Sequence, residues 1–151
     1  LSFSKPFHLI LTTEYVGQFL FEFVNEQKTM GLHIDVTVSH GMKETELLVD
    51  TRALQQILLN LVQNAQRYQL PGLPVQMSWN PIDRMIEVRD DGPGVNQEDL
   101  ENIFTPFFTT SHKGTGLGLA ISRKLAREMG GDLTYKEGHP GAKFILELRH
   151  D

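Results

Sequence analysis

Residues 51–68 read TRALQQILLNLVQNAQRY, and this stretch decides what kind of fold the chain can adopt. At 100° per residue, its apolar side chains fall on one broad stripe of a helix. The stripe consists of Leu54, Ile57, Leu58, Leu61, Val62 and Ala65. Asp50 precedes the stretch as a candidate N-cap, and Pro71 and Gly72 close the loop behind it. The pattern therefore predicts an amphipathic helix that packs against a core.

A polar stripe lies on the shoulder of the same helix, between its apolar and its solvent sides. It consists of Gln56, Asn60, Asn64 and Arg67, with Tyr68 nearby. Amide oxygens spaced by four residues can coordinate a hard cation, and magnesium accepts few protein ligands when phosphates supply the others. Taken alone, such amides far more often hydrogen-bond water, so the stripe needs support from the rest of the chain.

Further elements are predicted on both sides of this helix. Helical spacing predicts a helix over residues 13–28, ended by Gly31, and another that opens at the glycines of 114–118 and stops at 130–131. Apolar runs predict strands over residues 32–38, 75–79, 85–89, 132–136 and 143–148, a short extended segment over 5–9 and a short helix over 97–103. Three long helices and at least five strands predict an α+β fold, a two-layer α/β sandwich whose mixed sheet carries the helices on one face.

Composition places this sandwich in an ordinary globular protein. The 151 residues are 40% hydrophobic, which suits one domain over 1–151, with residues 1–4 as the end of a preceding segment. The net charge of −5 argues against a broad nucleic-acid-binding face, and the lack of cysteine excludes disulfides and thiolate metal sites. The six histidines are scattered and predict no metal site. No apolar run is long enough to span a membrane, so we expect no membrane contact by this domain.

The first glycine-rich turn, Asp90 to Gly94, ends the predicted strand over 85–89. A buried carboxylate at position 90 would only accept hydrogen bonds, which suits the amino group of an adenine. Gly92 and Gly94 would let the backbone approach the base closely. For this turn on its own, a plain connection between two elements is the alternative.

The second glycine run, Gly114 to Gly118, opens a helix. Its backbone amides can converge on an anion, and the helix start adds the positive end of a dipole, so the run is a candidate phosphate site. It differs from dinucleotide-binding folds because no strand leads into it, and it lacks the lysine-serine ending of a Walker loop. Between the two glycine runs, Ile103 to Thr110 carries three phenylalanines. They either anchor a loop in the core or belong to a movable lid, on which they would close over a nucleotide or dock on a partner.

Four features follow one another along the chain: the helix with the amide stripe, the first glycine turn, the Phe-rich segment and the glycine run that opens a helix. Together they resemble the catalytic ATP-binding domain of sensor histidine kinases, within the gyrase, chaperone, kinase and MutL ATPase superfamily. The resemblance covers nearly the whole chain and implies the Bergerat-type ATP-binding fold. The matching motifs are Leu59 to Tyr68 for the asparagine box, Asp90 to Gly94 for the first glycine box, Thr105 to Thr110 for the phenylalanine box and Gly114 to Leu119 for the second glycine box. The pattern of the last two boxes is similar to that of nitrogen-regulator-type sensor kinases.

The resemblance implies a role for each matching residue, with ATP and Mg²⁺ as the ligands. Asn64 would hold the magnesium ion with support from Asn60, and Arg67 would replace the family's usual lysine near the phosphates; these three are the catalytic candidates. Tyr68 would pack on the nucleoside, and Asp90 would read the adenine. The other nucleotide-binding candidates are Gly92, Gly94, Val95, Phe107, Lys113, Gly114, Thr115, Gly116, Leu117 and Gly118, and residues 95–113 resemble a short ATP lid.

The resemblance also separates a kinase from an ATPase. Hydrolases of the superfamily carry a glutamate four residues before the metal asparagine, and here that place is taken by Asn60, whose amide cannot act as a general base. None of the histidines in this chain has the sequence context of a phosphoacceptor. We therefore expect the catalytic domain of a protein-histidine kinase, which donates the γ-phosphate of ATP to a histidine on a separate helical dimerisation domain of the same parent protein.

Partners and location follow from the same resemblance. It implies a two-component signal-transduction system, with a response regulator as an indirect partner and a cytoplasmic position for this domain, even where the parent protein is anchored in a membrane. Two alternatives stay open. One is a serine kinase of the anti-sigma-factor type, and the other is a non-catalytic ATP-binding interaction module.

Overall fold

A computed structural model describes residues 8–38, 46–108 and 117–148. Helix α2 has the bounds that the sequence predicts, Thr51–Tyr68. The other elements in chain order are β1 (Thr12–Tyr15), α1 (Val16–Thr29), β2 (Ile34–Val38), β3 (Glu46–Val49), β4 (Val75–Asn80), β5 (Met85–Asp90), α3 (Gly118–Glu128), β6 (Asp132–Glu137) and β7 (Ala142–Glu147). The predicted extended segment over 5–9 lies largely outside the described residues.

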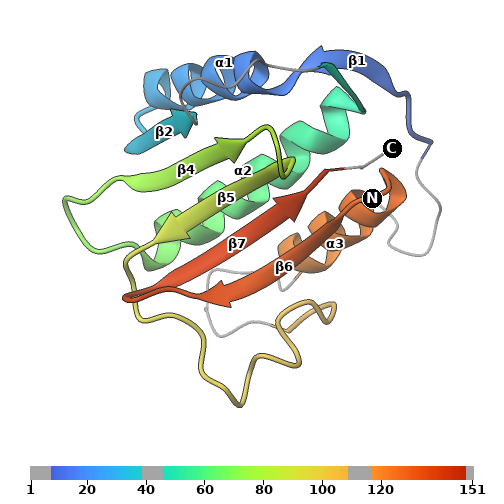
Figure 1. Cartoon of the computed structure of the whole chain (residues 1–151). Helices are drawn as coiled ribbons and strands as arrows, with labels where there is room; N and C mark the ends of the chain where they lie inside the picture. Colours follow the sequence, from blue (N-terminus) through green and yellow to red (C-terminus); the bar gives the residue numbers. More distant parts are fainter. Residues whose placement is uncertain (1–7, 39–45, 109–116, 149–151) are drawn as a thin grey trace.

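Five strands form one mixed sheet in the order β2-β4-β5-β7-β6. β2 runs parallel to β4, whereas β4, β5, β7 and β6 pair antiparallel. Figure 1 shows the three helices on one side of this sheet, with α2 behind its middle strands, α3 behind β6 and β7, and α1 beyond β2. The predicted α+β fold, with two layers and a mixed sheet, is confirmed.

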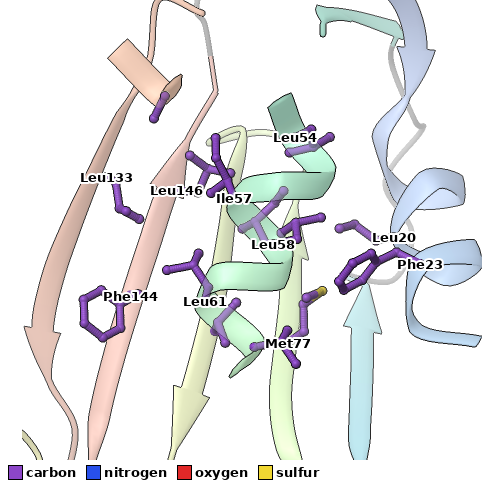
Figure 2. Packing of buried hydrophobic residues seen from close by; sticks show 14 of the residues in the cluster. Leu20, Phe23, Leu54, Ile57, Leu58, Leu61, Met77, Leu133, Phe144 and Leu146 are labelled. Atoms are coloured by element: carbon purple, nitrogen blue, oxygen red, sulfur yellow. The ribbon is translucent and has the colours of Figure 1, made fainter. Parts of the chain in front are cut away.

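The core lies between α2 and the sheet (Figure 2). Alternation along the strands explains why one sheet face is buried: in β4, for example, Val75 and Met77 are buried while Gln76 and Ser78 are half-buried. The apolar stripe of α2 packs against these inward side chains. Buried members of the contact include Leu54, Ile57, Leu58 and Leu61 of α2, Leu20 and Phe23 of α1, Met77 of β4, Leu133 of β6, and Phe144 and Leu146 of β7.

Asp50 fixes the start of α2, as the sequence predicts. Its Oδ1 accepts a hydrogen bond of 2.9 Å from the main-chain N–H of Ala53, which is the geometry of an N-cap. Its Oδ2 accepts a second bond of 2.7 Å from the main-chain N–H of Ile10. One buried carboxylate therefore caps the helix and holds the chain that enters the domain.

The structure differs from the sequence predictions in two segments. The helix predicted over 13–28 begins at Val16, because residues 12–15 form β1, which pairs antiparallel with β3. The sequence pattern predicted neither of these two strands. Residues 97–103 form successive turns instead of the predicted short helix, with bonds such as that from the N–H of Asp99 to the carbonyl of Asn96. Asn and Asp side chains favour turns over helix, which accounts for the difference.

Within the described ranges, none of the helices is both long enough and apolar enough to cross a membrane.

Candidate nucleotide-binding site

Asp90 is the last residue of β5, and its side chain is only 2% exposed. Its Oδ1 accepts a hydrogen bond of 2.9 Å from the main-chain N–H of Gly92. A carboxylate has room for further donors beyond this one, and the amino group of an adenine is such a donor. The buried position and the free acceptor capacity fit the predicted role of Asp90 in reading adenine.

Burial raises the pKa of the Asp90 carboxyl above its usual value. The main-chain N–H groups of Gly92 and Ala142 act in the opposite direction, and the neighbouring charge of Asp91 raises the pKa further. The protein thus holds an acceptor in a place where its charged form is costly. Buried carboxylates with a raised pKa are more frequent at functional sites than elsewhere.

Gly92 lies against the end of α2. A Cβ at position 92 would collide with the main-chain carbonyl oxygen of Tyr68, so the turn after β5 packs directly on the last residue of the helix. The predicted reason for this glycine was close approach to a base, whereas the observed close approach is to Tyr68. Tyr68 itself is half-buried at the same junction.

The next residues of the turn are held by β6. The main-chain N–H of Val95 donates a hydrogen bond of 3.2 Å to the hydroxyl of Tyr135. Gly94 has a positive φ of 76° and lies close to Gly141, which precedes β7. The first glycine turn is therefore fixed between the end of α2 and the β6–β7 hairpin.

Asn60 ties α2 to α3. Its Nδ2 donates a bond of 3.1 Å to the main-chain carbonyl of Gly118 and one of 3.0 Å to the hydroxyl of Ser122. Its Oδ1 accepts a bond of 3.0 Å from Gln56. Both amide hydrogens of Asn60 are thus used to hold the start of α3, and its support of a metal ion stays a prediction.

Asn64 lies one helical turn after Asn60 and is half-buried. Within the described residues, its side chain has no hydrogen-bond partner, unlike that of Asn60. Its amide oxygen is therefore available for a ligand, which fits the predicted role as the magnesium-holding residue. Arg67 is exposed on the last turn of the same helix.

The three phenylalanines of the Phe-rich segment have different surroundings. The ring of Phe104 packs edge-on against Phe144, with 6.3 Å between centroids, and the guanidinium of Arg123 lies 4.6 Å from its centroid. Phe108 is half-buried against the core. Phe107 is 74% exposed and has a positive φ of 69°, which is rare for a bulky residue. The segment is anchored at Phe104 and offers Phe107 to solvent.

Part of the predicted phosphate site lies outside the described residues. These residues are Lys113, Gly114, Thr115 and Gly116. Leu117 and Gly118, which follow them, stand at the start of α3, where the sequence predicts the end of a phosphate-binding run. The hydrogen bond from Asn60 to the carbonyl of Gly118 places this helix start beside the polar shoulder of α2.

Sequence reasoning missed three residues that build the site: Gln69, Ser122 and Tyr135. Each acts through a contact with a residue far away in the chain, so no local pattern marks it. The one available signal is the spacing of Gly118 and Ser122, which are four residues apart and therefore lie on one face of α3.

Residues 49–151 match the family model described as histidine kinase-, DNA gyrase B-, and HSP90-like ATPase. This match covers more than half of the chain. The chain belongs to that family, and its fold is that of histidine kinase catalytic domains.

Individual relatives are sensor kinases. Sensor protein kinase PilS of Pseudomonas aeruginosa is 37% identical over 118 residues, 73% of this chain and 22% of PilS. Sensor histidine kinase ZraS of Salmonella typhimurium is 33% identical over 157 residues, 98% of this chain and 33% of ZraS. The chain thus spans a third or less of these relatives.

Solved structures agree with this assignment. The catalytic domain of histidine kinase ThkA superposes with a TM-score of 0.77 at 29% identity, covering 93% of this chain and 96% of that domain. Full-length ShkA, solved in complex with AMPPNP, superposes with a TM-score of 0.76 at 29% identity over 96% of this chain and 32% of ShkA.

Proposed function

We propose that this domain binds Mg-ATP and donates the γ-phosphate to a histidine on a separate helical phosphoacceptor domain of its parent protein. The observation that carries the proposal is the junction between the end of β5 and the end of α2. There the buried carboxylate of Asp90 lies on a turn packed against the helix that presents Asn64. The proposed adenine acceptor and the proposed metal ligand would thus lie on one packed unit, as binding of a nucleoside triphosphate requires.

The described residues supply the two ends of such a site. Asp90 would accept the amino hydrogen of the adenine, and Tyr68 would pack on the nucleoside. Asn64 would give its amide oxygen to Mg²⁺, which would neutralise charge on the phosphates. Arg67 would add a positive charge near the phosphates.

The surroundings of Asn60 favour phosphoryl transfer over hydrolysis. A hydrolase needs a base to take a proton from the attacking water, and an amide has no such capacity near neutral pH. Here both amide hydrogens of Asn60 are already donated to Gly118 and Ser122. Phosphoryl transfer mainly needs positioning and charge neutralisation, so a correctly presented histidine would suffice as the acceptor.

Phe107 supports a partner that docks beside the nucleotide. Phe107 is a large apolar residue that is 74% exposed, so its burial by a partner would lower the free energy. Its left-handed backbone holds it outward while Phe104 anchors the segment inside. We infer that this residue contacts the phosphoacceptor hairpin, and that the phosphate then passes to a response regulator in the cytoplasm.

A transfer assay with radiolabelled ATP tests the proposal. The 151 residues alone should bind Mg-ATP, label themselves negligibly and release phosphate slowly. Adding the two-helix phosphoacceptor segment of the parent protein as a separate chain should produce acid-labile phosphohistidine on that segment, because in-line positioning supplies most of the rate. Rapid phosphate release by the domain alone would support a hydrolase. Acid-stable label on serine would support a kinase of the anti-sigma-factor type. ATP binding without any transfer would support a non-catalytic ATP-binding interaction module.

The role of Asn64 has its own test. Asn64→Ala should reduce the gain in ATP affinity that Mg²⁺ provides by about tenfold, because the ion would lose its ligand from α2. ATP affinity in the presence of EDTA should change little. Calorimetric titrations with and without Mg²⁺ measure both quantities. Gln63→Ala, at the exposed neighbouring position of α2, is the matched control. An unchanged magnesium dependence in Asn64→Ala would exclude this residue as the metal ligand.

A further inference from the structure

Gln69 follows the last residue of α2, and its side-chain amide uses every hydrogen-bonding position that it has. Its Oε1 accepts bonds from the main-chain N–H of Asp91, at 2.8 Å, and of Leu70, at 2.9 Å. Its Nε2 donates to the carboxylate Oδ2 of Asp91, at 3.0 Å, and to the main-chain carbonyl of Pro74, at 2.8 Å. The four hydrogen bonds of this uncharged side chain, which we call the Gln69 clip, therefore join the main chain at Leu70, Pro74 and Asp91.

Two of these four bonds go to Asp91, one to its main chain and one to its carboxylate. Asp91 is the residue after Asp90, so the clip acts one peptide unit away from the proposed adenine acceptor. On the other side of Asp91, Gly92 packs against the carbonyl of Tyr68. The turn that carries Asp90 is thus joined to the end of α2 at two successive residues.

We propose that Gln69 is a positioning residue for base recognition, which holds the Asp90 turn in register with α2. The inference rests on the proposed function, because it assumes that Asp90 reads adenine while Asn64, on the same helix, holds the metal ion. A nucleotide that contacts both residues can do so only if the distance between the two elements is fixed. A direct hydrogen bond loses its strength when its angle or length is relaxed, so a loosened turn would weaken recognition of the base.

A purely structural role predicts a different result. If Gln69 only stabilised the loop, its loss would lower the affinity for all nucleotides by the same factor. A positioning role instead predicts loss of discrimination. ATP carries the 6-amino group from which Asp90 would accept a hydrogen bond, and purine riboside triphosphate lacks this group. The ratio of the two affinities isolates the contact with that group, because the triphosphate and Mg²⁺ are the same in both.

The first variant removes the clip while keeping the approximate size of the side chain. Gln69→Leu should lower the preference for ATP over purine riboside triphosphate by about tenfold, with a small change in the affinity for the latter. Calorimetry in Mg²⁺ measures both affinities, and urea unfolding of each variant shows that the domain is folded. A wild-type protein without any preference would overturn both this inference and the proposed adenine contact. A wild-type preference that persists in Gln69→Leu would overturn the inference alone.

A reversed pair gives the sharper test. Gln69→Glu keeps the acceptor toward the main chain but places two carboxylates together, so it should lose the preference. Asp91→Asn keeps an acceptor for the amide of Gln69, so this variant should retain the preference for ATP. In the variant that carries both changes, the amide introduced at position 91 can donate to the carboxylate introduced at position 69, so the bond re-forms with donor and acceptor exchanged.

We expect this double variant to recover most of the preference for ATP. Gln63→Glu, a matched charge change on the exposed face of α2, should not alter the preference. If Gln69→Glu and the double variant lost the preference for ATP equally, the proposed role of the bond between residues 69 and 91 would be contradicted.

Discussion

Replacing Asp90 by asparagine should lower the affinity for Mg-ATP by between about fivefold and about 150-fold, equivalent to about 1–3 kcal/mol. The side chain is buried, and asparagine offers an NH₂ group where the adenine also presents a donor. Two donors that face each other in a buried place leave both unpaired, and this carries the cost of desolvation without a hydrogen bond. Titration calorimetry measures the loss directly.

The same substitution should leave the domain without nucleotide at least as stable as the wild type at neutral pH. Burial raises the pKa of the Asp90 carboxyl in the folded state above its unfolded value. The folded state therefore prefers the protonated carboxyl, and stability is lost as the pH rises through the raised pKa. Asparagine removes this loss, so the two proteins should become alike as the pH falls toward the ordinary aspartate pKa of 3.8.

Urea unfolding of both proteins from about pH 4 to about pH 8 measures this convergence. Asp83→Asn is the matched control, because Asp83 is exposed in the turn at the other end of the β4–β5 hairpin. It should not change the ATP affinity. Equal ATP affinities of the wild type and Asp90→Asn would show that the adenine does not lie at Asp90.

Gly141→Ala should destabilise the domain by about 3 kcal/mol or more, which is large against the usual stability of a single domain. Gly141 has a positive φ of 94°, which costs a residue with a side chain about 1 kcal/mol. In addition, a Cβ there would collide with the main-chain carbonyl oxygen of Asp90 and lie 2.9 Å from the Cα of Asp91. Backbone cannot move aside as the end of a flexible side chain can, so the end of β5 would have to shift.

Gly72→Ala separates the two costs. Gly72 has a similar φ of 84°, but a Cβ at this position meets no atom within 4 Å. Its substitution should therefore cost only the strain of the left-handed backbone, about 1 kcal/mol. Urea unfolding of the two variants gives the difference. If both glycines gave the same loss, the close packing of the β6–β7 hairpin against Asp90 would be wrong. Because that hairpin borders the site, Gly141→Ala should also weaken ATP binding in the fraction that folds.

The local signals of the sequence determined the three helices, the five strands of the main sheet and their order along the chain. The cap at Asp50 and the apolar stripe predicted the bounds of α2 correctly, because both signals depend on neighbours within a few residues. Alternation likewise predicted β4 through β7 to within one residue or so at each end. The order of the four motifs indicated the family that residues 49–151 match.

Only the tertiary structure decided how these elements meet. The β1–β3 pair joins distant residues such as Thr12 and Val49, and such pairing leaves little trace in strands of only four residues each. The sequence placed Asn60 and Asn64 together as amides on one shoulder. The fold separates their roles, because Asn60 bonds to Gly118 and Ser122, which lie 58 and 62 residues away along the chain. A hydrogen bond between distant residues depends on where the chain returns, and no pattern at either residue specifies that.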